Sequence, residues 1–382
     1  MTTNVLGLVN PTFVKIALRE SWRDLRALRH PTRPLLAHLQ AALEWLALAQ
    51  DQAGNGGVSA GFGRRGWRPD YPETTGYIIP TCLDYYHLTG DQTFLERARQ
   101  MGDYELQVQT GEGAIPGGYA HPRSPCVFDT GQVIFGWVAL YHETGNATYL
   151  AAAQAAGNWL CKIQAGDGSW PKFDHADSAR TYHARVSWAL VQLGQTCQAA
   201  RFIEAAQRHL SWTVAHQNEL GWFANAELRG QPFPVTHTIA YTIRGLLESG
   251  HALPSDPWLA SARRAADALL RAQLADGSLF GMYDQTWTPR ARWRCVTGCA
   301  QMSINWLRLY ELTGQAHYLD AARKSNLFVM QTQDLETRDP VRGALKGSWP
   351  CYGQYERFSY PNWAAKFLAD ALLLEQKLAP KV

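Results

Sequence analysis

A helix-forming segment that ends in glutamine recurs along the chain at a nearly constant interval. The glutamines are 53 to 59 residues apart and stand in WLALAQ (Gln50), YELQVQ (Gln109), WLCKIQ (Gln164), WTVAHQ (Gln217), LLRAQ (Gln273) and FVMQTQ (Gln331). Six copies of one unit within 382 residues predict a repeat architecture, because such a unit buries its apolar face only against its neighbours.

Each period contains two helical patterns of different character. The pattern that ends at the glutamine, as in YLAAAQAAGNWLCKIQ (149–164), has apolar residues at i, i+3 and i+4 spacing and polar residues on the other face. The second pattern, as in DTGQVIFGWVALYHE (129–143), is apolar nearly all round, which is typical of a helix buried on both sides. We therefore predict an outer layer of amphipathic helices around an inner layer of apolar helices.

The alternation of six outer and six inner helices predicts an all-α fold, an (α/α)6 toroid in which helical hairpins close into a ring. The first outer helix is expected at about residues 33–52 and the last inner helix at about 361–377. An open α-solenoid is the alternative, but its repeats are usually shorter, at roughly 33–47 residues. We expect one toroid domain over residues 31–382, with residues 1–30 adding a helix on its outside.

The two connections within each period differ in length. Tight turns such as LTGDQ (88–92) lead from inner to outer helices, whereas the return connections are long and rich in glycine and aromatic residues. These return loops cover residues 53–72, 110–127, 165–179, 218–235, 274–295 and 332–360. Long loops in a compact domain are usually functional. We therefore predict that the working face is the rim where these loops lie above the N-termini of the inner helices.

Charge and hydropathy disfavour several classes of function. The formal net charge is only +3, which does not favour a nucleic-acid binder. No apolar run reaches the ~20 residues of a membrane span, and the N-terminus lacks the apolar core of a secretory signal, so we expect a cytoplasmic protein.

The seven cysteines are scattered, which is typical of reduced thiols. We expect no cofactor and no metal site.

Polar and aromatic residues recur near the first turns of the inner helices. One set is spaced by 53 to 62 residues and would form a ring around a central cavity: Tyr77, Gln132, Arg185, Tyr241, Gln301 and Trp363. Further candidates flank this ring: Glu73, Asp129, Tyr182, His183, His237, Arg244 and Lys366. Each has a structural explanation when taken alone, such as acidic residues on a helix dipole. Taken together, these residues predict a catalytic or substrate-binding site around the central cavity.

Two chemistries fit these residue types. Glu73 and Asp129 could be the acid and base of a glycoside hydrolase. Abstraction of the C5 proton of a uronic acid instead needs a base, a proton donor and a cation for the sugar carboxylate. We favour this second chemistry, in which Glu73 and Asp129 orient hydroxyl groups. Its candidates are His183 or His237 as base, Tyr182 or Tyr241 as donor, and Arg185 or Arg244 for the carboxylate.

Tryptophan residues in the return loops are candidates for stacking on sugar faces. Trp67 lies in RRGWR (64–68) and Trp170 follows a glycine turn, and aromatic faces of this kind bind sugars and cations. Arginine residues interleave with tryptophan again in RARWR (290–294). These segments are locally basic and give some support to an anionic substrate.

The pattern Q-x-x-x-G-x-W at Gln164, Gly168 and Trp170 resembles the QW motif of squalene and terpene cyclases, whose helical domains are also α/α toroids. We infer a structural role, in which the amide bonds the frayed helix end and the aromatic ring fills the gap between hairpins. The acidic D-x-D-D run of class II cyclases is absent. A cyclase-like activity is therefore a minor alternative.

A larger combination of segments resembles α/α-toroid proteins found with bacterial exopolysaccharide biosynthesis. It comprises PETTGY (72–77), FDTGQ (128–132), DGSW (167–170), YHAR (182–185), THTIAYTIRGL (236–246) and GSWPCYGQYERFSYPNWAAKFLADAL (347–372). The part CYGQYERFSYPNW is also similar to the tyrosine-rich end of glucuronyl C5-epimerases. These resemblances imply a polysaccharide or oligosaccharide partner. We predict a lyase or C5-epimerase, with a glycoside hydrolase and a non-catalytic glycan-binding or assembly factor as alternatives.

Overall fold

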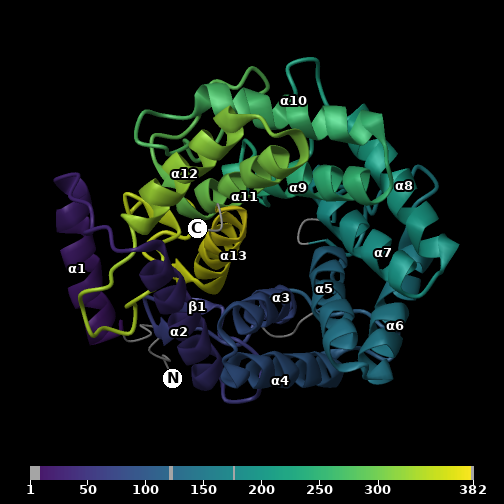
Figure 1. Ribbon diagram of the computed structural model, residues 1–382, viewed down its shortest axis with the longest axis horizontal. Helices are drawn as coiled ribbons and strands as arrows, with labels where there is room; N and C mark the ends of the chain where they lie inside the picture. Colours follow the sequence, from purple (N-terminus) through teal and green to yellow (C-terminus); the bar gives the residue numbers. More distant parts are fainter. Residues whose placement is uncertain (1–8, 120–123, 175–176, 380–382) are drawn as a thin grey trace, which may run out of the picture.

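The computed structural model describes residues 9–119, 124–174 and 177–379, and its helices form two concentric layers of a ring (Figure 1). The outer helices are α2 (Leu35–Ala53), α4 (Gln92–Val108), α6 (Ala147–Ile163), α8 (Ala200–Ala215), α10 (Asp256–Ala272) and α12 (Ala316–Met330). The inner helices are α3 (Pro72–Thr89), α5 (Val127–Thr144), α7 (Ala184–Thr196), α9 (Thr236–Ala252), α11 (Val296–Thr313) and α13 (Asn362–Leu378). The predicted (α/α)6 toroid is confirmed.

The two ends of the chain close the ring. Each inner helix packs against the next one, and α13 packs against both α3 and α2. Short strands reinforce this closure, because β1 (Gly61–Gly63) pairs with β2 (Gly66–Trp67) and with β5 (Tyr360–Pro361). A second pair, β3 (Arg294–Cys295) with β4 (Ser348–Trp349), joins the last two return loops.

The recurring glutamine joins neighbouring hairpins. Nε2 of Gln164 donates hydrogen bonds to the Gly168 carbonyl in its own loop and to the Ala205 carbonyl in the next outer helix, both at 2.9 Å. Gly168 has φ +89°, and a Cβ there would lie 2.7 Å from the Arg208 carbonyl, so the turn requires glycine. Trp170 is fully buried, and its indole N–H donates to the Leu160 carbonyl at 2.9 Å. The QW-like segment is therefore part of the scaffold.

The same two-way bridge occurs at four other predicted positions, namely Gln50, Gln109, Gln217 and Gln273. In the sixth repeat the bridging residue is Gln333 and not Gln331, so the predicted alignment is wrong there by two residues. Gln333 donates to the Gly343 carbonyl at 2.7 Å and to the His38 carbonyl at 3.3 Å. Gln331 keeps helical backbone angles after α12, whereas Gln164 is extended after α6. The chain therefore makes a further turn before its bridging glutamine.

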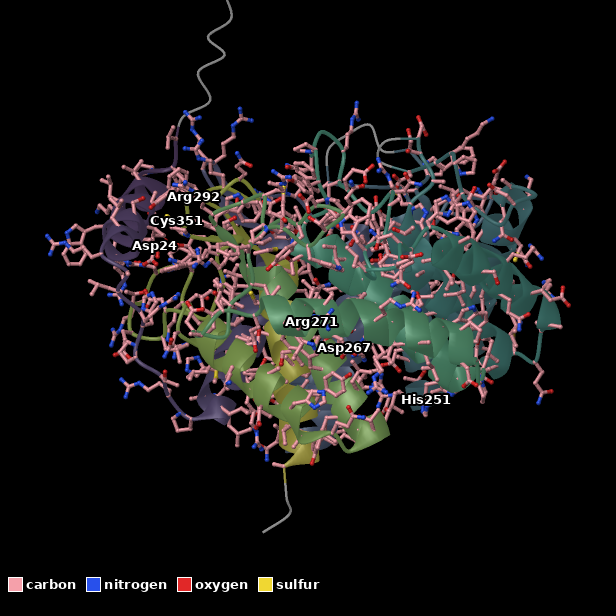
Figure 2. The ribbon with its side chains drawn as sticks, turned by 90° about the horizontal axis from the view of Figure 1, so that it is seen from above. Asp24, His251, Asp267, Arg271, Arg292 and Cys351 are labelled. Carbon is pink, nitrogen blue, oxygen red and sulfur yellow. The ribbon has the colours of Figure 1, made fainter. Side chains whose placement is uncertain are left out.

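The N-terminal helix α1 (Pro11–Leu25) lies on the outside of the ring, against the last return loop (Figure 1). The contact contains a buried ion network, in which Lys346 Nζ lies 2.9 Å from carboxylate oxygens of both Glu20 and Asp24. Asp24 also accepts a hydrogen bond from the Cys351 backbone N–H at 2.7 Å, and Figure 2 shows these two residues side by side. Because each buried charge has a partner, the network holds α1 in place.

The two rims of the ring differ in what covers them. Viewed from the side, the return loops gather at one edge, and Arg292 lies toward that edge (Figure 2). His251, near the end of α9, lies toward the other edge, where tight turns connect the helices (Figure 2). We call these edges the loop rim and the short-turn rim. No helix in the described ranges is long and apolar enough to cross a membrane.

Replacing a bridging glutamine is expected to loosen the ring. Gln164→Leu removes the hydrogen bonds of the amide to its own loop, to the Ala205 carbonyl and from Arg208. It should lower the free energy of unfolding by about 1–3 kcal/mol, measured by chemical denaturation. Gln207→Leu on the exposed face of α8 is the control, and it should change the same quantity by no more than about 0.5 kcal/mol. Equal effects of the two substitutions would contradict the bridging role.

Candidate active site

A central cavity of about 1380 Å³ lies inside the ring of inner helices. All six inner helices line it, and none of its lining residues belongs to a long return loop. The lining continues to the C-terminal ends of the inner helices, where Leu88 and Lys377 are exposed. The cavity is larger than most small-ligand pockets, which are about 300–1,000 Å³. Because its lining reaches the C-terminal ends of the inner helices, the cavity extends toward the short-turn rim. The sequence predicted a working face at the other edge, the loop rim.

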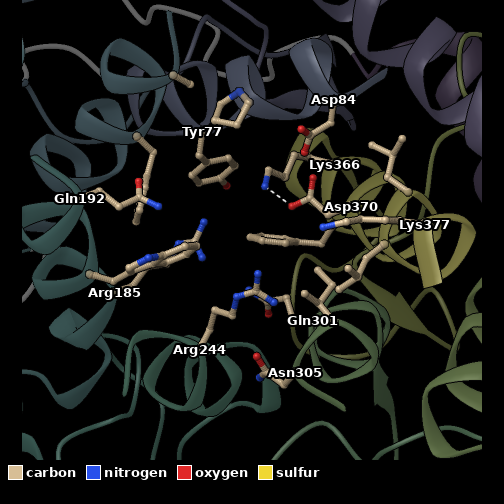
Figure 3. A pocket seen from close by; sticks show the side chains of 18 of the residues that line it. Tyr77, Asp84, Arg185, Gln192, Arg244, Gln301, Asn305, Lys366, Asp370 and Lys377 are labelled. Atoms are coloured by element: carbon tan, nitrogen blue, oxygen red, sulfur yellow. Dashed lines mark hydrogen bonds and ion pairs between the residues drawn. The ribbon is translucent and has the colours of Figure 1, made fainter. Parts of the chain in front are cut away.

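Arg185, in the first turn of α7, lines this cavity (Figure 3). Its Nε donates to Gln132 Oε1 at 2.6 Å, and no ion pair joins Arg185 to a carboxylate within the described residues. Its guanidinium carbon lies 5.0–5.9 Å from the ring centroids of Phe135, Tyr241, Trp188, Phe367 and Tyr77. Aromatic faces stabilise a cation without neutralising it, so the terminal nitrogens stay available to an anionic ligand.

Two further cations lie beside Arg185 (Figure 3). Arg244 pairs with Glu248 at 3.0 Å. Glu248 is shared at 2.8 Å with Arg308, which also pairs with Glu311, so the charges of this group balance. Lys366 pairs with Asp370 one helical turn away, and burial lowers the pKa of Lys366 to about 8. Of these three cations, Arg185 is therefore the one that has no carboxylate partner among the described residues.

His237 has the features of a general base. Its Nδ1 lies 2.8 Å from Gln301 Oε1, and because that oxygen only accepts, the ring proton is assigned to Nδ1. Nε2 makes no hydrogen bond within the described ranges. Burial lowers the pKa of His237 to about 4, so the imidazole is neutral at pH 7 with its lone pair on Nε2.

Tyr241 stands one turn after His237 on α9, and the two ring centroids are 4.5 Å apart. The Tyr241 side chain lines the cavity, and its hydroxyl lies beside that of Tyr77. Burial, followed by the charge of Glu73, raises the pKa of Tyr241 well above its ordinary value. The hydroxyl therefore keeps its proton and can act as a donor.

Glu73 and Asp129 lie behind this layer of rings, on the side of the loop rim. Glu73 accepts a hydrogen bond from the Tyr71 hydroxyl, and Asp129 accepts one from the Gly118 backbone N–H at 2.8 Å. The Trp363 ring packs edge-on against Tyr71 at 6.2 Å. Both carboxylates are buried and neither lines the cavity. They lie in the first turns of α3 and α5, on the side of the return loops.

The other predicted residues lie farther from the cavity. His183, in the 3-10 turn η1 (Thr181–His183), is fully buried with Nε2 3.2 Å from Asp174, and Tyr182 lies 3.4 Å from the same carboxylate. Trp67 packs against Trp45 with ring centroids 5.7 Å apart. Neither these residues nor the buried Trp170 line the cavity.

The structure thus brings together about half of the predicted set. The predicted residues that line the cavity are Tyr77, Arg185, Tyr241, Arg244, Gln301 and Lys366, and Gln132 and His237 are bonded to members of this group. Sequence reasoning missed Asp84, Trp188, Phe367 and Asp370. These residues stand three to seven positions beyond ring residues on the same inner helices, so extending each helix face by two turns would have found most of them.

No protein-family model matches the sequence, and no curated protein matches it. Among solved structures, unsaturated glucuronyl hydrolase from Bacillus sp. GL1 is similar at a TM-score of 0.71 and 15% identity, covering 89% of this chain and 96% of that chain. Cellobiose 2-epimerase from Bacillus thermoamylovorans has a TM-score of 0.70 at 12% identity, covering 95% and 100%. A polysaccharide lyase has a TM-score of 0.64 at 12% identity, covering 92% and 99%.

At these identities the likeness shows a shared toroid fold. The neighbours are carbohydrate-active enzymes of several reaction types. The resemblances to exopolysaccharide proteins and to terpene cyclases stay predictions.

The imidazole of His237 is expected to titrate near pH 4, since burial disfavours its cation. Long-range ¹H–¹⁵N spectra recorded across a pH series would measure this. Gln301→Leu removes the acceptor that stabilises the charged ring, so it should lower the pKa further. An unfolded histidine protonates near pH 6.5. His237 should therefore reduce the stability of the folded chain as the pH falls from about 6.5 to about 4. A midpoint near 6.5 in the folded protein would contradict this environment.

Proposed function

We propose that this protein is an enzyme that acts on a carbohydrate bearing a carboxylate, and that the sugar binds in the central cavity with its carboxylate on Arg185. The observation that carries the proposal is the Arg185 guanidinium, which is buried among aromatic rings and is not neutralised by any described acid. Arginine matches the planar geometry of a carboxylate through paired N–H donors. The surrounding rings offer apolar faces to a sugar.

The structural neighbours support the substrate class. The named activities are a glucuronyl hydrolase, a cellobiose epimerase and a polysaccharide lyase, all of which act on sugars. One glucuronyl hydrolase structure is named with the oligosaccharide dGlcA-Glc-Rha-Glc. A cavity of about 1380 Å³ has room for more than one sugar ring, which fits an oligosaccharide or the end of a polysaccharide.

Abstraction of the C5 proton is the chemistry that the cavity residues favour. An acidic C5–H requires that the neighbouring carboxylate be neutralised, and Arg185 with Lys366 supplies positive charge for this. His237 has an unprotonated Nε2 to take the proton, and Tyr241 has a hydroxyl that can hydrogen-bond the substrate or return a proton. His237 is favoured over His183, because His183 is enclosed and already bonded to Asp174.

Hydrolysis by Glu73 and Asp129 is the second candidate. Both carboxylates raise the pKa of Tyr71, after the larger effect of burial, which places them around one hydroxyl. Two carboxyl groups on either side of a scissile bond are the arrangement that glycoside hydrolases use. Neither carboxylate lines the cavity, and His237 does not line it either, but it is bonded to Gln301, which does. C5 chemistry ranks first because Arg185 and Tyr241, which it requires, line the cavity.

A panel of oligouronides and polyuronides separates the reactions. An eliminating enzyme should create an unsaturated product with new ultraviolet absorbance. An epimerase should exchange deuterium into C5 without cleavage, and a hydrolase should release reducing ends without new absorbance. Binding without any of these products would indicate a non-catalytic glycan-binding protein and would contradict the proposal.

The loss of kcat/KM caused by each substitution, measured on any substrate that the protein turns over, ranks the residues by their contribution to catalysis. Arg185→Gln and His237→Gln should each lower kcat/KM by at least ~10²-fold, while Glu73→Gln should cost less. Because the pKa of His237 is about 4, kcat/KM should be limited on its acid side only near pH 4. Circular dichroism and thermal unfolding would check that each variant folds. Indispensable Glu73 and Asp129 together with a dispensable His237 would favour hydrolysis.

A further inference from the structure

Large apolar side chains lie exposed along the N-terminal helix α1, on the outside of the ring. They are Val14, Leu18, Trp22, Leu25 and Leu28, and Leu18, Trp22 and Leu25 are 68%, 50% and 73% exposed. The first four recur at helical spacing and share one face of α1. We call these five residues the apolar stripe. A cluster of exposed apolar side chains usually marks a contact surface, whereas single ones need no explanation.

The orientation of α1 on the ring is the reverse of the usual one. Its buried residues are Phe13, Ile16, Glu20 and Asp24, and both acids contact the Lys346 ammonium at 2.9 Å. A surface helix normally buries its apolar face and exposes its charges. Because the buried contacts already hold α1 in place, the apolar stripe is a fixed surface that is available to another partner.

The charges that α1 and its C-cap expose are all positive. The only acids in residues 9–34 are Glu20 and Asp24, and both are buried. Lys15 and Arg26 are exposed, and neither forms an ion pair with a described residue. At 100° per residue, these two cations lie along one edge of the apolar stripe. The exposed face of α1 is therefore apolar with a basic edge.

A second basic segment lies against the N-terminus of α1. The backbone N–H of Asn10, the N-cap of α1, donates to the Arg64 carbonyl at 3.0 Å. Arg64 and Arg65 are exposed and form no ion pair within the described part of the chain. They belong to the RRGWR segment (64–68), none of which lines the cavity. The basic character of this segment is thus directed to the outside of the ring.

We propose that the apolar stripe and its neighbouring cations dock this protein on the surface of an anionic lipid bilayer. Helices that lie in a membrane interface combine Trp and Leu on one face with Lys or Arg beside them. Tryptophan suits this interface because its ring is apolar and its N–H is polar. The inference concerns a different surface from the cavity and does not rest on the proposed reaction.

A second copy of this chain fits the apolar stripe less well than a bilayer does. Since both acids of α1 are buried, a symmetric pair of α1 helices would offer no acid to Lys15 and Arg26. Stable protein interfaces also use about 20–30 residues a side, whereas the stripe has five. A bilayer needs no complementary shape, and anionic headgroups attract basic residues near its surface.

Docking through α1 would leave the cavity accessible. The helix lies at the circumference of the ring and away from its axis (Figure 1). The cavity lies inside the ring and extends toward the short-turn rim. A bilayer bound at the outside of the ring therefore does not cover this opening.

Co-sedimentation of the full chain with lipid vesicles tests the proposal. Vesicles of phosphatidylcholine mixed equally with phosphatidylglycerol should bind the wild-type protein, and phosphatidylcholine alone should bind it at least ~10-fold more weakly. The double substitution Leu18→Gln and Leu25→Gln should weaken binding to the anionic vesicles at least ~10-fold, because it removes apolar contact without adding charge. The matched control, Leu220→Gln and Leu312→Gln, changes two exposed leucines outside α1 and should bind like the wild type.

Two further measurements identify the surface that binds. Lys15→Gln with Arg26→Gln should weaken binding and reduce its dependence on salt, since fewer charges remain to be screened. Among the described residues, Trp22 is the one tryptophan with a largely exposed side chain. Brominated lipid should therefore quench the fluorescence of the bound wild-type protein and quench Trp22→Phe much less.

Each alternative has its own outcome. Wild-type protein that does not bind the anionic vesicles would overturn the proposal, as would undiminished binding by the variant with glutamine at both leucines of the stripe. Circular dichroism and thermal unfolding would confirm that this variant folds. Sedimentation velocity without lipid tests self-association, and a dimer that the same two substitutions dissociate would assign the stripe to a second copy and overturn membrane docking.

Discussion

The amide bridge between neighbouring hairpins is the interaction on which the rest of the structure depends. One glutamine side chain, such as Gln164, bonds a carbonyl in its own loop and a carbonyl in the next outer helix. Because the same bridge recurs around the ring, successive hairpins are held at a similar height. The first turns of the inner helices consequently lie at one level, and their polar side chains converge on the ring axis. A site made of single residues from six helices requires this regularity.

The polar side chains that converge on the ring axis include several cations, and isolated charges are costly in a protein interior. The structure lowers this cost in different ways at different positions. Arg244 and Lys366 have carboxylate partners, whereas Arg185 has an amide oxygen and aromatic faces. Only the second arrangement, an amide oxygen and aromatic faces, leaves a cation that can bind an anionic ligand. The distinction explains why Arg185, among three basic residues in one cavity, is the best candidate for carboxylate recognition.

Features that repeat were predictable from the sequence, and features that depend on contacts between distant loops were not. The spacing of the repeat predicted the toroid. It also predicted that Tyr77, Arg185, Tyr241 and Gln301 line one cavity. It misplaced the sixth bridge, because Gln333 follows an extra turn that breaks the period. The predicted working face at the loop rim stays a prediction, although the cavity extends toward the short-turn rim. Contacts between segments far apart in the sequence, such as Trp363 in the first turn of α13 on Tyr71 before α3, lie on the side of the return loops, and no local pattern encodes them.

Glu73 and Asp129, in the first turns of α3 and α5, have an electrostatic role. Glu73 contributes to the raised pKa of both Tyr77 and Tyr241, and Asp129 contributes to that of Tyr241, while Arg185 opposes them in each case. The acids therefore act on the same rings as Arg185, from the far side of the aromatic layer and without forming an ion pair with it. Their negative charge offsets part of the cost of burying the guanidinium and keeps both phenols protonated. Direct pairing would neutralise Arg185, so separation by a layer of rings preserves its capacity to bind an anion.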